Sequence, residues 1–195
     1  AVLMISVLLI ACAKKDDTIR IVFLPNESNE SLKESREEFA KIIEKSVNKK
    51  VEIITTTDYN IAIENIISGK AQIAYIGAEG LLSAAERSSD VQAVLTNSGA
   101  SGTIKDSLYY SFIAVREEDA AQYRSGDGYD LKKIKGKSVS FVTNSSTSGF
   151  KVPARVIASE FGLKSEEEVL EPGTVFSKII FGSSHPGTQV NLFKK

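Results

Sequence analysis

Four neighbouring side chains that carry hydroxyl groups are the clearest candidates for chemistry: Ser145, Ser146, Thr147 and Ser148. Gly149 follows them, and Pro153 comes four residues later. Because proline lacks a backbone N–H, it is tolerated in the first turn of a helix, so Pro153 predicts a helix that begins close to residues 149–152. Free N–H groups and the positive end of the helix dipole meet at such a terminus. Hydroxyls and amides together could bind an anion with three or four oxygens, which predicts a phosphate-type site without Lys or Arg.

An ordinary helix cap is the alternative interpretation of the same residues. Serine and threonine are favoured at helix N-termini for structural reasons alone, so a cap would explain one of them. A run of four hydroxyl side chains before a glycine is more than capping requires. The spacing alone leaves both interpretations open, and Ser146, Thr147 and Ser148 are the candidate ligands.

Other kinds of site find little support in the sequence. The chain has one cysteine, Cys12, and one histidine, His185, so it can form neither an intramolecular disulfide nor a cysteine-based zinc site. Neither the Gly-x-Ser-x-Gly motif of serine hydrolases nor a Walker-type phosphate loop occurs. We therefore expect a protein that is not an enzyme and that has no cofactor and no metal site.

The composition is that of a globular protein. Of 195 residues, 42% are hydrophobic and 25% are charged, and 24 basic against 25 acidic residues give a net charge of −1. This balance argues against nucleic-acid binding, which usually needs a basic excess on one face. A small anion can still be bound through local dipoles. The length suits one domain or two small lobes.

Alternating strand-like and helix-like patterns must position these residues. Strands are expected at residues 19–24, 51–55, 73–76, 91–95, 108–115, 138–142 and 175–181. Helices are expected at residues 32–47 (with Ser31 as N-cap), 59–68, 80–87 and 152–161, with a helical turn at 131–134. This order predicts an α/β fold with mainly parallel sheets. A polar stretch at residues 116–130 divides the chain into two lobes, 18–115 and 116–195, with a cleft between them.

The beginning of the chain has the pattern of an export signal. Residues 1–11 are an apolar run, too short to cross a bilayer, and Cys12 follows Ala11. Leu9-Ile10-Ala11-Cys12 resembles the bacterial lipobox, so we expect residues 1–12 to be a clipped signal segment, Cys12 to be lipidated and residues 13–17 to be a tether. A buried strand that contains a cysteine is the alternative. An acylated cysteine would anchor the domain to a membrane.

Several motifs, taken in order, resemble one family. Residues 131–142 lead into the Ser-Thr-Ser-Gly-Phe-x-x-Pro motif that ends at Pro153, and 75–77, 109–111 and 176–185 match further elements. Together they resemble the phosphonate-binding family of ABC solute receptors. The resemblance implies a two-lobed, periplasmic-binding-protein-like fold of type II, with a mainly parallel sheet in each lobe. Relatives continue beyond Lys195, so the second lobe is expected to be incomplete, and a relative's acidic residue that recognises an amine has no counterpart here.

The resemblance also implies roles for individual residues. Ser146, Thr147 and Ser148 would bind the oxyanion, Tyr59 and Tyr109 would close over it from the first lobe, and His185 would donate a further hydrogen bond. Each has an alternative: Tyr59 could pack in the core, Tyr110 could face the cleft in place of Tyr109, and His185 could lie in a surface loop.

The function that the resemblance implies is transport. The protein would be a lipoprotein of the cell envelope, on the outer side of the cytoplasmic membrane, that binds phosphonate, phosphite or phosphate and delivers it to ABC permease subunits. A receptor for sulfonate or a thiamine-like compound, and an effector-sensing domain of the same fold, are the alternatives.

Overall fold

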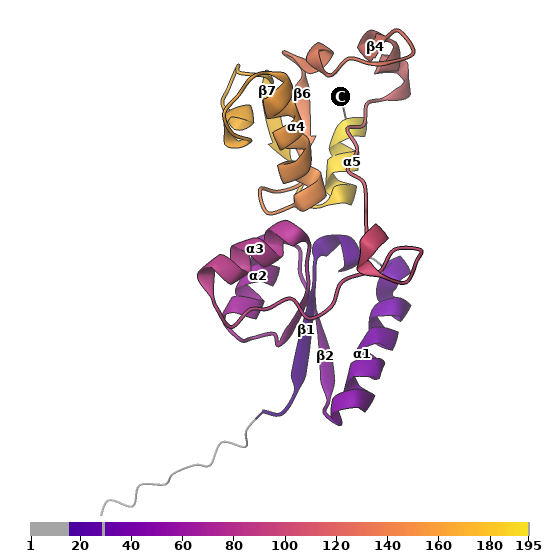
Figure 1. The fold of residues 1–195 in the computed structure, drawn as a ribbon, viewed down its shortest axis with the longest axis vertical. Coiled ribbons are helices and arrows are strands. Elements are labelled where there is room, and N and C mark those ends of the chain that lie inside the picture. The colour runs from indigo at the N-terminus through magenta and orange to yellow at the C-terminus, as the bar shows by residue number, and fades with distance from the viewer. Residues whose placement is uncertain (1–15, 29, 195) are drawn as a thin grey trace, which may run out of the picture.

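Two lobes stacked along the longest axis form the molecule, with a long connection between them (Figure 1). The computed structural model describes residues 16–28 and 30–194. The predicted signal segment and Cys12 lie outside the described residues.

The first lobe contains a parallel sheet in the order β2-β1-β3. Its strands are β1 (Ile19–Phe23), β2 (Val51–Thr55) and β3 (Ile73–Tyr75). Its helices are α1 (Lys33–Val47), α2 (Tyr59–Ile67) and α3 (Ala78–Arg87). Helix α1 covers one face of the sheet, and α2 and α3 lie on the other (Figure 1). The helices alternate with the strands, as the pattern predicts for parallel β-α-β units.

Burial on both faces explains why β1 is continuously apolar from Ile21 to Phe23. Ile21 and Phe23 pack with Ala40 of α1. Val22 points to the opposite face, where it packs with Ala62 of α2. Successive side chains of a strand point to opposite faces, so the side chains of β1 pack against α1 on one face of the sheet and against α2 on the other.

The second lobe has a smaller parallel sheet. Strands β6 (Ser138–Phe141) and β7 (Lys178–Phe181) pair in parallel, and β4 (Arg124–Ser125) and β5 (Gly128–Tyr129) form an antiparallel pair. Its helices are α4 (Val152–Glu160) and α5 (His185–Phe193). Phe141, Phe150 and Phe176 pack edge to face in a core to which α4 contributes Ile157.

Short helical turns complete the described chain. They are η1 (Pro25–Ser28), η2 (Glu30–Leu32), η3 (Ile104–Asp106), η4 (Glu117–Tyr123), η5 (Leu131–Ile134) and η7 (Glu167–Leu170), together with the π turn η6 (Thr147–Lys151). The prediction that Ser31 is the N-cap of α1 is wrong. Ser31 lies inside η2, and the residue directly before α1 is Leu32.

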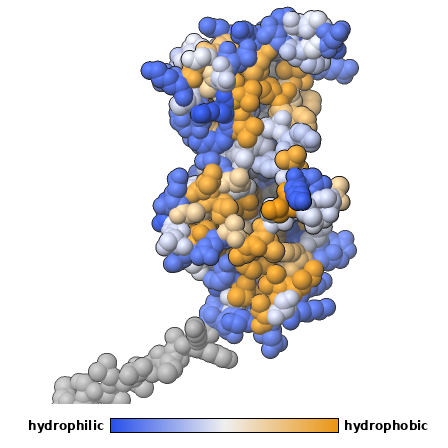
Figure 2. Space-filling model, viewed as in Figure 1, coloured by the Kyte–Doolittle hydropathy of each residue, from blue (hydrophilic) through white to orange (hydrophobic). Residues whose placement is uncertain are grey.

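Two predicted strands are wrong. Residues 91–116 contain no strand, and the apolar side chains of Leu108 and Phe112 are 77% and 82% exposed. Apolar and β-branched residues form a strand only when a neighbouring strand pairs with them and covers one face. The segment instead connects the lobes (Figure 1). Figure 2 shows apolar side chains exposed on one face of both lobes.

No helix within residues 16–28 and 30–194 is both long enough and apolar enough to span a membrane.

Candidate functional site

The hydroxyl cluster begins a helix, as its sequence predicts. After β6 the chain turns through residues 142–146 into the π turn η6, and α4 follows with Pro153 in its first turn. The side chain of Ser146 is 1% exposed, and its Oγ accepts a hydrogen bond from the backbone N–H of Gly149 at 3.1 Å. Ser146 therefore acts as the helix cap behind the surface on which Thr147 and Ser148 lie.

Gly149 is required by the close approach of the turn to β6. A Cβ added there would lie 2.3 Å from Cγ2 of Val142, which is closer than two carbon atoms can pack. The carbonyl of Gly149 also accepts a hydrogen bond from the N–H of Val142 at 3.1 Å. Glycine thus lets the turn fold back on the strand that precedes it.

Thr147 points at the first lobe. Its Oγ1 accepts a hydrogen bond from the backbone N–H of Glu79, in the first turn of α3, at 2.9 Å. Gly77 precedes α3, and a Cβ added to it would lie 3.0 Å from the Thr147 oxygen. Residues 75–77, one of the matching segments in the sequence, therefore end at a place where the first lobe approaches the hydroxyl cluster.

Ser148 lies beside His185, the first residue of α5. Ser148 Oγ and His185 Nε2 are 3.3 Å apart, and the carbonyl of Ser148 accepts a hydrogen bond from Ser111 Oγ at 2.6 Å. Burial lowers the pKa of His185 below its ordinary value, because desolvation disfavours the charged imidazolium. The neutral ring has one donor and one acceptor nitrogen.

Tyr59 reaches the same place from the first lobe. It is the first residue of α2, with 4% of its surface exposed, and its hydroxyl accepts a hydrogen bond from Nδ2 of Asn26. Asn26 Oδ1 in turn accepts the backbone N–H of His185 at 2.9 Å. Tyr59 also packs with Val142 of the second lobe in one apolar cluster, which agrees with the alternative that it packs in the core. Its closure over an oxyanion stays a prediction.

Two further contacts join the lobes around this group. Ser145 Oγ donates to Oδ1 of Asn60 at 2.6 Å, and Lys151 Nζ lies 3.9 Å from a carboxylate oxygen of Glu79. Lys151 also pairs with Glu167 at 3.0 Å. The junction is therefore held by neutral hydrogen bonds, with one ion pair at its side.

Of the predicted site residues, the structure brings together Thr147, Ser148, His185 and Tyr59, with Ser146 buried behind them. Tyr109 lies apart in the connection between the lobes, with 64% of its surface exposed. Tyr110 lines a pocket of the second lobe but is itself 74% exposed. The roles proposed for these two tyrosines stay predictions.

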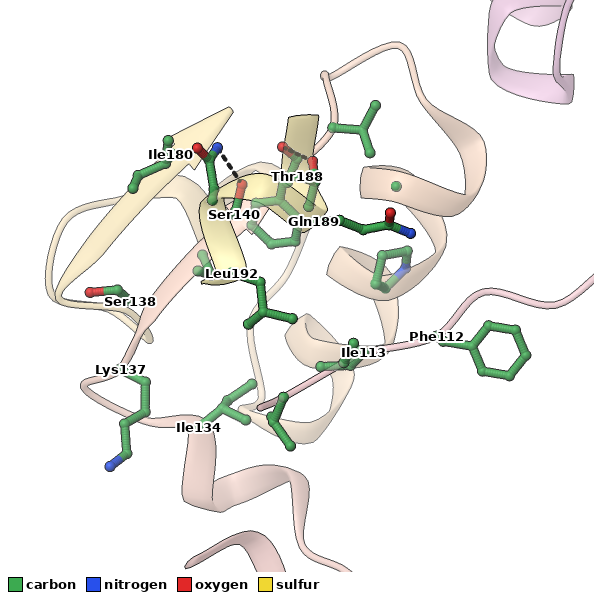
Figure 3. Close-up of a pocket in the computed structure, with 18 of the residues that line it drawn as sticks. Phe112, Ile113, Ile134, Lys137, Ser138, Ser140, Ile180, Thr188, Gln189 and Leu192 are labelled. Atoms are coloured by element: carbon green, nitrogen blue, oxygen red, sulfur yellow. Dashed lines mark hydrogen bonds between the residues drawn. The ribbon is translucent and has the colours of Figure 1, made fainter. Parts of the chain in front are cut away.

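A cavity of about 1120 Å³ lies in the second lobe (Figure 3). Its walls include the apolar side chains of Ile113, Ile134 and Leu192, and Ser148 and His185 also line it. Figure 3 shows Phe112 turned away from these residues. The walls also carry polar and charged side chains such as Arg116 and Lys178, and the cavity shares Ser148 and His185 with the polar group at the lobe junction.

Sequence reasoning missed Asn26, Asn60 and Glu79. A signal for Asn26 was present, because it follows Pro25 directly after β1, and ligands of parallel α/β folds bind beyond the carboxyl ends of the strands. Asn60 and Glu79 carried no comparable signal, since polar residues in the first turn of a helix are common for structural reasons.

Solved structures define the class of fold. A binding protein component of an ABC phosphonate transporter from Pseudomonas aeruginosa matches with a TM-score of 0.61 and 21% identity, over 90% of this chain and 52% of that chain. PhnD1 from Prochlorococcus marinus, solved in complex with methylphosphonate, matches with a TM-score of 0.59 and 16% identity, over 89% and 58%. The chain has part of the two-lobed α/β fold of these binding proteins, as predicted.

The sequence defines the family. Residues 21–195 match the model of the family described as ABC transporter, phosphonate, periplasmic substrate-binding protein. The phosphate-import protein PhnD of Mycolicibacterium smegmatis is 32% identical over 157 residues, which are 78% of this chain and 45% of that protein. The chain therefore belongs to the phosphonate-binding family of ABC solute receptors, a family of transport proteins, and spans about half the length of these relatives.

Proposed function

We propose that this protein binds a phosphorus oxyanion (a phosphonate, phosphite or phosphate) in the cleft between its lobes and delivers it to the permease of an ABC importer. One observation carries the proposal: hydrogen bonds connect Ser148, His185, Asn26 and Tyr59 across both lobes at the beginnings of helices. Thr147, next to Ser148 in the chain, bonds to the first turn of α3 in the first lobe.

Such a group suits a tetrahedral oxyanion. Each oxygen of the anion accepts hydrogen bonds, and hydroxyl, imidazole and amide groups supply donors without full positive charges. Helix N-termini add partial positive charge at the same place. Binding by both lobes would favour their closed arrangement, which is the form that a permease could distinguish from the open one. No bond is made or broken.

The lipobox-like segment at residues 9–12 supports a proposal for the location of the protein in the cell. We propose that Cys12 carries the lipid and that residues 13–17 tether the domain to the outer side of the cytoplasmic membrane. The partners are then the oxyanion, the permease subunits and, through the lipid, the membrane. Metabolic labelling with a fatty acid tests this directly: the wild-type chain is labelled and a Cys12→Ser variant is not.

A thermal-shift panel tests the ligand class. The panel is phosphate, phosphite, methylphosphonate, aminoethylphosphonate, sulfate and taurine. A ligand at 100 times its dissociation constant adds about 2.7 kcal/mol of stability, which is readily measured. A shift with phosphorus oxyanions supports the proposal, a shift with sulfate or taurine alone supports a sulfonate receptor, and a cooperative transition that no ligand moves would overturn both.

Two variants test the site within that panel. Thr147→Ala and Ser148→Ala each remove a hydroxyl at the lobe junction, so the affinity for the oxyanion should fall by about tenfold or more, the value of one hydrogen bond to a charged group. Ser46→Ala is the matched control, because its hydroxyl donates to the carbonyl of Ile42 on the exposed surface of α1. Unchanged affinity in both junction variants would contradict the proposed site.

A further inference from the structure

Two helices begin at the lobe junction, and each receives a hydrogen-bond acceptor from the opposite lobe. The first N–H groups of a helix have no acceptor within the helix. The N–H of Glu79 in α3 of the first lobe donates to Thr147 of the second lobe. The N–H of His185 in α5 of the second lobe donates to Asn26 of the first lobe. The sequence motifs indicated Thr147 but gave no role to Asn26.

The orientation of the Asn26 amide follows from its partners. A backbone N–H can only donate, so the atom that faces His185 at 2.9 Å must be the amide oxygen. The amide nitrogen then faces Tyr59 and donates to its hydroxyl oxygen. Asn26 therefore joins one proposed ligand residue of each lobe through the two ends of a single rigid amide.

The contacts of His185 connect these hydrogen bonds to the hydroxyl cluster. Its backbone is bonded to Asn26, and its ring nitrogen Nε2 lies 3.3 Å from Ser148 Oγ. Asn26 itself is only partly exposed and lies in η1, the turn that follows β1. A shift of the amide would move the Tyr59 hydroxyl and the beginning of α5 together.

We infer that Asn26 is a positioning residue of the binding site, which holds Tyr59 and His185 in register across the closed lobes. The inference rests on the proposed function. It also explains why an amide suits this position: a carboxylate of the same shape would accept hydrogen bonds from both partners but would add a negative charge beside the bound anion.

The test compares Asn26→Ala and Asn26→Asp with the wild-type chain, using phosphate and methylphosphonate as probes. Asn26→Ala loses both contacts, so affinity should fall by about tenfold. Asn26→Asp keeps acceptors for both partners but repels the anion, so affinity at pH 8 should fall by about a hundredfold. Titration calorimetry gives the affinities, and denaturant unfolding without ligand reports the folding of each variant.

The pH dependence of the affinity distinguishes a positioning role of Asn26 beside the anion from a merely structural role. Between pH 8 and pH 5.5 phosphate loses negative charge and the introduced carboxyl approaches its pKa, so the ratio of Asn26→Asp affinity to wild-type affinity should rise. Asn26 is hydrogen-bonded to the Tyr59 hydroxyl and to the backbone of His185, and the titratable side chains of these two residues are present in both proteins. The ratio for Asn26→Ala should stay constant.

Asn97→Ala is the matched control. Asn97 Nδ2 also donates to a tyrosine hydroxyl, that of Tyr75 at 2.9 Å, but Asn97 is exposed and this hydrogen bond lies within the first lobe. Its affinity should equal that of the wild type. If the wild type binds and both Asn26 variants bind as tightly, or if the loss in Asn26→Asp does not depend on pH, the inference is overturned. If the folded wild type binds no phosphorus oxyanion, the proposed function fails instead.

Discussion

At the scale of single residues, His185 connects ligand binding to protonation. Its ring is half-buried next to Ser148, and burial lowers its pKa because the imidazolium is poorly solvated there. An anion placed beside the ring would favour the charged form and oppose that effect. The protonation state of one residue should therefore respond to the oxyanion.

Proton NMR can follow this response, because His185 is the single histidine of the chain. In the ligand-free protein we expect a pKa below the ordinary value of about 6.5, and a rise on addition of phosphate. A lowered pKa in the folded protein means that, as the pH falls, the unfolded chain takes up the proton first. The free energy of unfolding should therefore decrease as the pH falls through the ordinary pKa. An ordinary pKa that phosphate leaves unchanged would contradict this prediction.

Alanine substitution should affect stability at Ser146, which has a structural role, but hardly at Ser148, which has the proposed binding role. Ser146→Ala removes a buried capping hydroxyl, so the free energy of unfolding should fall by about 1 kcal/mol. Ser148→Ala should leave stability nearly unchanged, because its hydroxyl faces the lobe junction and is only partly buried. Denaturant unfolding measures both, and equal losses would show that the two hydroxyls are not divided in this way.

At the scale of elements, the segment from β6 into α4 was predictable because its signals are local. Pro153 marked the first helical turn, and the hydroxyl residues before Gly149 marked the beginning of the helix. The strand-like pattern at residues 108–115 failed for the opposite reason. Strand formation depends on a partner strand, and a run of apolar residues does not encode which segment will pair with it.

Gly149→Ala tests the packing of this element. The new Cβ would lie 2.3 Å from Cγ2 of Val142, so the turn or the strand must shift. We expect a loss of about 1–3 kcal/mol in the free energy of unfolding, which is typical of overpacking. Gly128→Ala is the control, since a Cβ there meets nothing within 4 Å and its φ is not positive. Equal stability of the two variants would contradict the close approach.

At the scale of the whole molecule, the arrangement of the lobes was the least predictable feature. Motif resemblance named Thr147 and His185, but their partners Glu79 and Asn26 are 68 and 159 residues away in the chain. Local patterns fix strands and helices, whereas these contacts depend on how the two lobes meet, where Val142 of the second lobe joins an apolar cluster of the first. Polar residues in first helical turns are too common to reveal such pairs from sequence alone.

Gly77→Ala tests the meeting of the lobes without disturbing either core. Gly77 has an ordinary φ of −77°, so alanine fits the backbone, but its Cβ would lie 3.0 Å from Oγ1 of Thr147. The hydroxyl must move away from α3 and weaken its hydrogen bond to the N–H of Glu79. Stability should change by no more than about 0.5 kcal/mol, whereas the affinity for phosphate should fall by about tenfold, the value of one lost hydrogen bond.

Small-angle scattering of the ligand-free Gly77→Ala protein supplies a readout that needs no ligand. If contact at Thr147 holds the lobes together, the variant should have a larger radius of gyration than the wild type. Gly80→Ala is the control in the same helix, because the atoms nearest to a Cβ there belong to Ile76 and Ile63 of its own lobe, at 3.4 Å or more. An unchanged radius together with unchanged affinity would mean that the lobes are held by their other contacts, the Asn26 and Asn60 hydrogen bonds, with Thr147 contributing little.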